Sequence, residues 1–109
     1  MLRAAPVAIG DSSSNGDARK QARRDRAEQR VRSAPLRKEV ERIEKQLAAL
    51  ERERTSVLAE LADPATYANG NPRASALTQS AGELARRIGE LEDAWLEAHA
   101  ALEAAEVDA

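Results

Sequence analysis

The chain has 109 residues with a formal net charge of −2, and its 42% hydrophobic residues include no Phe, one Trp and one Tyr. More than half of that hydrophobic fraction is alanine, so the composition suits long helices that bury a narrow seam better than a thick globular core. The absence of cysteine excludes disulfides and thiolate metal sites, and a single histidine excludes most His-based metal and catalytic sites.

The hydropathy of the chain gives no membrane or export signal. The apolar stretch within residues 1–10 is short and is interrupted by Pro6, so it does not reach the length of a signal-peptide core. No apolar run approaches the roughly 20 residues that span a bilayer. The sequence therefore predicts a soluble protein of the cytoplasm that does not engage a membrane.

Residues 1–33 form a basic segment in front of an acidic one. They hold eight Lys and Arg against four Asp and Glu, a net charge of +4, whereas residues 34–109 hold nine against fifteen, a net charge of −6. Residues 1–17 are mostly small or polar, with the stretch DSSSNGD at 11–17, and residues 18–32 contain helix formers but only one large apolar side chain, Val31. Because such a segment buries too little apolar surface to offset its lost conformational entropy, we predict a disordered or partly helical basic linker.

A heptad pattern begins after this linker and predicts a helix over about residues 35–62. Ser33 and Pro35 are residue types that start helices. From there the seam positions advance in alternating steps of four and three residues, which is the spacing of a coiled coil. These positions are Leu36, Val40, Ile43, Leu47, Leu50, Arg54, Val57 and Leu61.

A second heptad pattern predicts another helix over about residues 72–104, followed by a tail at 105–109. Its seam positions are Leu77, Ala81, Leu84, Ile88, Leu91, Trp95, Ala98 and Leu102. Facing positions of the two patterns, such as Ile43 and Trp95, have numbers that sum to 138, as an antiparallel hairpin requires. The sequence therefore predicts an all-α fold in which residues 34–104 form a two-helix antiparallel coiled-coil hairpin.

The segment between the two patterns, residues 63–71, has the composition of a tight turn. Proline stops a helix or occupies its first turn, and Asn and Gly tolerate a positive φ angle. The midpoint of the 138 register, residue 69, also falls in this segment. We therefore expect it to be the tip of the hairpin. Its turn residues, with the proline that follows, are Asp63, Pro64, Asn69, Gly70, Asn71 and Pro72.

The polar residues of the second helix do not form a catalytic or metal site. Glu83, Glu90 and Glu97 recur every seven residues, which places them along one exposed face and not around a pocket. His99 stands beside the seam, with no second His or Cys to complete a metal site. We therefore predict that the chain is not itself an enzyme and that it uses no cofactor or metal.

Basic residues on the outer face of the first helix predict contact with nucleic acid. Four of them lie opposite the seam, where counterion release favours a polyanion, and the linker adds more. No aromatic side chain is interleaved with them, so binding is expected to be directed at phosphates and weakly sequence-specific. The candidate residues are Lys38, Arg42, Lys45, Arg52, Arg19, Lys20, Arg23, Arg24 and Arg26. A plainer interpretation is that those of the first helix pair with Glu41 and Glu44 and keep the helix soluble.

Three motifs of the hairpin together point to a family. The first helix opens with PLRKEVERIEKQLAALERE, the turn contains L-A-D-P-x-x-Y at Leu61–Tyr67, and the second helix contains E-x-x-W-x-E at Glu92–Glu97. Over about residues 34–104 the chain resembles the C-terminal coiled-coil extension of ABC-F ATPases of the Uup type. The resemblance implies a cytoplasmic protein associated with DNA or with the ribosome and translation, in which a nucleic-acid-binding arm follows two ATPase domains in cis.

No ATPase motif occurs in the chain itself, so ATP binding would belong to the parent protein alone. The resemblance therefore implies either a fragment of a longer ATPase or a free-standing arm. The residues that match the family's arm and could contact phosphate are Lys38, Arg42, Lys45 and Arg52, with the basic linker in front of them.

Two other functions remain open on the sequence. The C-terminal tRNA-binding arm of valyl-tRNA synthetases is a similar hairpin, and it is also directed at phosphates. Alternatively, the hairpin is a structural protein-interaction module that docks on another coiled coil through Leu58 and Leu96, which lie beside the seam. Salt-dependent binding of a polyanion would distinguish the first two functions from the third.

Overall fold

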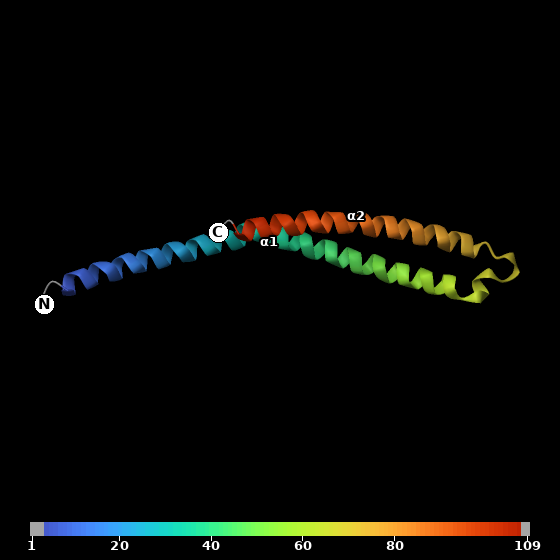
Figure 1. The fold of residues 1–109 in the computed structure, drawn as a ribbon, viewed down its shortest axis with the longest axis horizontal. Helices are drawn as coiled ribbons and strands as arrows, with labels where there is room; N and C mark the ends of the chain where they lie inside the picture. Colours follow the sequence, from blue (N-terminus) through green and yellow to red (C-terminus); the bar gives the residue numbers. More distant parts are fainter. Residues whose placement is uncertain (1–3, 108–109) are drawn as a thin grey trace.

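The computed structural model describes the backbone of residues 4–107 and the side chains of residues 15–107. It contains the helix α1 (Ala4–Ala62), the short 3₁₀ helix η1 (Pro64–Gly70) and the helix α2 (Arg73–Val107), and none of residues 4–107 forms a strand. The two long helices lie side by side as an extended hairpin, and the molecule measures 100 × 19 × 14 Å (Figure 1). The predicted all-α hairpin is therefore confirmed.

The seam between α1 and α2 follows the heptad pattern. Val40, Ile43 and Leu50 of α1 and Leu77 and Leu84 of α2 are at most 9% exposed. The other predicted seam positions are half-buried, apart from Arg54, whose side chain is exposed. The indole Nε1 of Trp95 donates a hydrogen bond to Glu44 Oε2 at 3.2 Å. Because Glu44 is next to Ile43 in the chain, this contact agrees with the 138 register.

The base of the hairpin is closed by two residues that the sequence analysis assigned to the linker. Ser33 is 1% exposed; its Oγ donates to the Arg30 carbonyl at 3.3 Å and accepts a hydrogen bond from Arg37 Nη1 at 2.6 Å. The Gln29 side-chain amide donates to the carbonyl oxygens of Ala105, at 3.5 Å, and Glu106. The last carbonyls of a helix have no partner within it, so Gln29 caps the end of α2.

α1 does not start at Pro35, where the sequence pattern placed a helix boundary. It runs from Ala4 through Pro35 to Ala62, and Figure 1 shows it passing the end of α2 as one helix. Proline costs a helix one hydrogen bond and crowds the preceding turn. Here Gln29 ties the helix before Pro35 to the end of α2, and Ser33 bonds to the Arg30 carbonyl and to Arg37 on either side of Pro35. The Gln29 contacts are long-range, so a local sequence rule cannot include them. The linker predicted to be disordered or partly helical over residues 1–33 is helical from Ala4 onward, and residues 1–3 lie outside the described residues.

Replacing Pro35 by Ala is expected to stabilise the chain. Pro35 is exposed, so Pro35→Ala removes little packing, while it restores the hydrogen bond to the Val31 carbonyl. Proline in a helix interior is less favourable than Ala by up to about 3 kcal/mol, and we expect a gain of that order in the free energy of unfolding. Urea denaturation followed by circular dichroism measures it.

Pro64→Ala is the matched control. Pro64 lies at the start of η1, where a fixed φ angle suits the backbone, so the same substitution should lower stability by about 0.5 kcal/mol. A loss of stability in Pro35→Ala would contradict this prediction, because it would mean that the ring of Pro35 stabilises the helix at this position.

The tip of the hairpin is a set of local caps. Asp63 Oδ1 accepts a hydrogen bond from the Ala65 N–H at 3.0 Å, and Asn71 Oδ1 accepts one from the Arg73 N–H at 3.0 Å, so Asn71 caps α2. Asn69 and Gly70 have φ angles of 59° and 66°, the left-handed conformation expected for them. The turn is thus placed and shaped as the sequence indicated.

The end of α1 is capped by two hydroxyl groups from η1. Thr66 Oγ1 donates to the Glu60 carbonyl at 2.6 Å, and Tyr67 Oη donates to the Leu61 carbonyl at 2.7 Å. Thr66 is 9% exposed and Tyr67 is 55% exposed. An ion pair of 2.6 Å between Arg73 Nη2 and Glu60 Oε2 ties the start of α2 to the same turn. The L-A-D-P-x-x-Y motif therefore acts as a helix C-cap.

Removing the Thr66 hydroxyl should cost more than removing the Tyr67 hydroxyl. Thr66→Val keeps the side-chain shape but deletes a buried hydrogen bond, which is worth about 1 kcal/mol of stability. Tyr67→Phe should lower stability by less, because the Tyr67 hydroxyl is exposed and water can donate a hydrogen bond to the Leu61 carbonyl in its place. Urea denaturation compares the two variants, and equal losses would contradict the role of Thr66 as the buried cap.

Candidate nucleic-acid interface

The continuous helix α1 brings the predicted linker residues and the predicted arm residues onto one element. On a helix with 3.6 residues per turn, the outer side of α1 holds six of the nine candidates within an arc of about 80°. These six are Lys20, Arg24, Lys38, Arg42, Lys45 and Arg52. The remaining three, Arg19, Arg23 and Arg26, lie further round the helix toward one flank.

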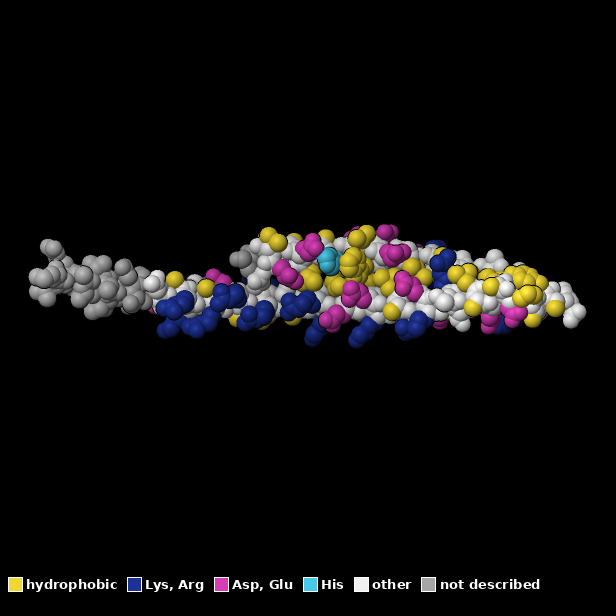
Figure 2. Space-filling model, turned by 60° about the horizontal axis from the view of Figure 1, so that its bottom comes forward, with side chains coloured by type: hydrophobic (Ala, Val, Ile, Leu, Met, Phe, Trp, Pro, Cys, Tyr) yellow, Lys and Arg dark blue, Asp and Glu magenta, His cyan; other side chains and the backbone are white. Residues whose placement is uncertain are grey.

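The six residues form a surface that we call the basic face. Lys20 and Arg52 are separated by 32 positions, so the basic face is about 48 Å long at 1.5 Å per residue. Figure 2 shows Lys and Arg side chains along one edge of the molecule, from the part of α1 that stands alone into the hairpin. All nine candidate side chains are exposed.

Most of these cations have no ion-pair partner within residues 15–107. Arg42 pairs with Glu39, with Nη2 and Oε1 2.5 Å apart and Nε donating to Oε2 at 3.1 Å. That hydrogen bond lowers the pKa of the Glu39 carboxyl and raises the pKa of Arg42. The other eight candidates form no ion pair within residues 15–107. The alternative interpretation, in which the basic residues of the first helix pair with Glu41 and Glu44, therefore does not agree with the observed ion pairs.

The outer face of α2 has the opposite charge. Glu83, Glu90, Asp93 and Glu97 are all exposed there, and the one Arg among them, Arg86, pairs with Glu90 at 2.7 Å. The hairpin therefore presents a basic side on α1 and an acidic side on α2, and only the first is suited to a polyanion.

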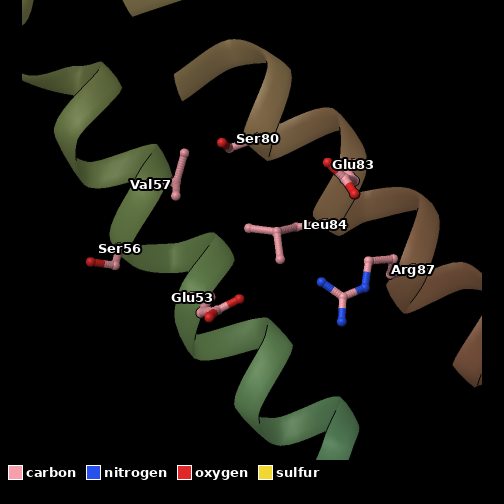
Figure 3. Close-up of a pocket in the computed structure, with 7 residues that line it drawn as sticks. All are labelled: Glu53, Ser56, Val57, Ser80, Glu83, Leu84 and Arg87. Atoms are coloured by element: carbon pink, nitrogen blue, oxygen red, sulfur yellow. The ribbon is translucent and has the colours of Figure 1, made fainter. Parts of the chain in front are cut away.

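A groove of about 420 Å³ lies between the helices where Val57 faces the small residue Ala81. Figure 3 shows Glu53 and Arg87 projecting toward it from opposite helices, with Leu84 between them. The lining mixes both charges and does not bring carboxylates together for acid–base chemistry. Its lining residues are Glu53, Ser56, Val57, Ser80, Glu83, Leu84 and Arg87.

The rest of the described chain offers no other chemical centre. No group of three or more His, Cys, Asp or Glu in the described residues could hold a metal ion. His99 stacks on Trp95, with ring centroids 4.6 Å apart, and its Nδ1 lies 3.3 Å from Glu103 Oε1. Within the part of the chain that was described, no helix combines the length and the apolar character needed to cross a membrane.

Residues 32–105 match the sequence model of a family described as the ABC transporter C-terminal domain. The chain belongs to this family. The match confirms the resemblance to the C-terminal extension of ABC-F proteins, and it makes the hairpin a C-terminal helical arm of ABC proteins. It begins beside Ser33 and ends at Ala105, the two ends that meet at the hairpin base. No curated protein and no solved structure matches the chain.

The family match covers only part of the basic face. It includes Lys38, Arg42, Lys45 and Arg52 but not the five candidates from Arg19 to Arg26. Sequence reasoning also missed Gln29 and Ser33 as part of the arm. Extending the heptad pattern backward from Leu36 by three and then four residues reaches Ser33 and Gln29. The heptad spacing therefore includes both positions, but a search for apolar residues does not find them.

Proposed function

We propose that this arm binds nucleic acid through the basic face of α1. The observation that carries the proposal is that eight of the nine candidate side chains are exposed and unpaired within residues 15–107, on a single continuous helix. Exposed cations release condensed counterions from a phosphate backbone when they bind it, and this release supplies affinity. The proposed ligand is DNA or ribosomal RNA, and the proposed setting is an ABC-F protein whose ATPase domains precede the arm.

The contact should be made by phosphates and not by bases. Base stacking requires aromatic side chains among the cations, and the Tyr and Trp of the chain lie elsewhere: Tyr67 is at the tip, and Trp95 is a seam residue of α2. Phosphate contacts position a protein on a duplex but carry no direct sequence information. Binding is therefore expected to be weakly sequence-specific.

The acidic side of α2 restricts how the arm can lie. A polyanion that approaches Glu83, Glu90 and Glu97 is repelled, so the ligand must follow the opposite side, along α1. The basic face is about 48 Å long, which is several times the spacing between phosphates along one strand of a DNA duplex. It can therefore contact several phosphates at once.

The test is binding of the 109-residue chain to labelled duplex DNA and to structured RNA across a range of salt concentrations. A protein that makes six or more phosphate contacts loses at least about 1,000-fold in affinity between 50 and 200 mM salt, and we expect a dependence of that kind. If neither ligand binds at about 50 mM salt, where phosphate contacts are strongest, nucleic-acid binding is ruled out. The remaining hypothesis is then that the arm is a protein-interaction module. A strong preference for tRNA would favour a role like that of the valyl-tRNA synthetase arm.

A further inference from the structure

One flank of the hairpin, near its base, carries an aromatic and apolar patch that the basic face does not use. His99 stacks on Trp95 at an interplanar angle of 18°, and 39% of the His99 side chain is exposed. Leu96, the next residue along α2, is 60% exposed. Figure 2 shows the imidazole beside hydrophobic side chains, with Asp and Glu side chains around them.

Carboxylates surround this patch on both helices. Along α2, the positions Glu92, Leu96, His99 and Glu103 advance by four, three and four residues, so they share one face of the helix. Glu103 approaches His99, and Glu44 reaches across from α1 to accept the Trp95 N–H. We call Trp95, Leu96, His99 and the carboxylates Glu44, Glu92 and Glu103 the acidic aromatic patch.

Within residues 15–107, no Lys or Arg side chain pairs with the carboxylates of the patch. Glu44 and Glu92 form no ion pair with Lys or Arg within residues 15–107. Arg37, a basic residue of α1 near the hairpin base, donates instead to Ser33 Oγ, at 2.6 Å, and to the Arg30 carbonyl. Arg54 of α1 lines a groove beside Glu92 but forms no ion pair with it. The patch is therefore an aromatic surface bordered by carboxylates that pair with no Lys or Arg side chain within residues 15–107.

From this arrangement we infer that the acidic aromatic patch docks an arginine-bearing segment of a partner protein. A guanidinium group is planar, so it stacks on an aromatic ring and at the same time donates paired hydrogen bonds to carboxylates. The patch offers both elements within a few residues, and Leu96 offers apolar surface for the stem of the arginine side chain. The same carboxylates repel phosphate, so this surface is separate from the basic face, and the inference does not depend on nucleic-acid binding.

The test is binding of the full chain to a labelled peptide of alternating Arg and Gly, with Lys–Gly and citrulline–Gly peptides of equal length as comparisons. Fluorescence anisotropy gives the affinity, and the emission of Trp95, the sole tryptophan, reports whether the peptide reaches the patch. We expect the Lys peptide to bind about tenfold more weakly than the Arg peptide, because ammonium groups do not stack as guanidinium groups do. The uncharged citrulline peptide should not bind.

Two paired variants separate the patch from general negative charge. E92Q/E103Q removes two carboxylates from the patch and should weaken binding of the Arg peptide about tenfold. E83Q/E97Q removes the same charge from the outer face of α2 and should change it by less than about twofold. His99→Ala should also weaken binding and reduce the preference for Arg over Lys.

Three results would overturn the inference. The first is an equal loss in both double variants, and the second is equal affinity for the Arg and Lys peptides. The third is a change of Trp95 emission with protein concentration alone and none with peptide, which would assign the patch to a second copy of the chain.

Discussion

The variant K38E/R42E/K45E/R52E is expected to lose nucleic-acid binding at about 50 mM salt, where the native chain binds most tightly. Each substitution removes one cation from the basic face and places an anion in its stead, so lost counterion release is joined by direct repulsion. The four side chains are exposed, and only Arg42 takes part in an ion pair, so the loss should not come from unfolding. We expect affinity for duplex DNA and for structured RNA to fall by more than about 100-fold.

Because four reversals also change the net charge of the chain, a smaller matched pair is the sharper control. K45E/R52E and R86E/R87E alter the net charge by the same amount, but the first acts on the basic face and the second on α2. Arg86 pairs with Glu90 on the surface, which contributes little to stability, so both variants should stay folded. Only K45E/R52E should weaken binding substantially.

Equal weakening by the two double variants would mean that net charge, and not the basic face, sets the affinity. Circular dichroism of all three variants confirms that helix content is kept. A normal spectrum together with unchanged binding in the fourfold variant would remove the basic face as the site.

The hairpin itself could be predicted because its determinants are periodic. The seam residues recur with heptad spacing, and their 138 register and the turn residues around Asn69 independently gave the same tip. Every predicted seam position except Arg54 is buried or half-buried in the structure. Burial of one stripe is the main source of helix stability in such a chain, so pattern and fold agree closely.

The ends of the arm could not be predicted in the same way. Gln29 binds carbonyls 76 and 77 positions away in the sequence, and Ser33 is buried although serine is not a typical core residue. Pro35 indicated a helix boundary, but tertiary contacts of the base oppose that local preference. Thr66 and Tyr67 cap α1 through side-chain hydrogen bonds that depend on how η1 folds back.

The candidate site could be predicted only as a set of residue types. The sequence places Lys38, Lys45 and Arg52 on one face because helix geometry is regular. It could not show that Arg42 pairs with Glu39 while the lysines stay unpaired, because i,i+3 and i,i+4 partners compete on an exposed helix surface at similar energies. Nor could it show that Arg37 bonds to Ser33 and not to a carboxylate beside Trp95.

Ile43→Ala is expected to cause the largest loss of folding stability of any single truncation in the seam. Ile43 is 2% exposed, the most buried hydrophobic side chain among the described residues, and it packs in the layer of Trp95. Truncating a buried Ile to Ala costs about 2–5 kcal/mol, through lost transfer energy and the cavity left behind. Trp95 is only half-buried and its N–H bonds to the exposed Glu44, so Ile43 should contribute more of the packing energy of this layer.

The consequence should be partial or complete unfolding, because native domains of this size have only about 5–15 kcal/mol in total and a hairpin with one thin seam belongs at the low end. Urea denaturation followed by circular dichroism measures the loss, with Ile43→Val as an intermediate step of about 1 kcal/mol. Leu96→Ala is the matched control, since Leu96 is 60% exposed and its truncation should change stability by less than about 0.5 kcal/mol. Equal losses of stability in Ile43→Ala and Leu96→Ala would show that the seam does not hold the two helices together. The hairpin would then not determine how the basic face is oriented.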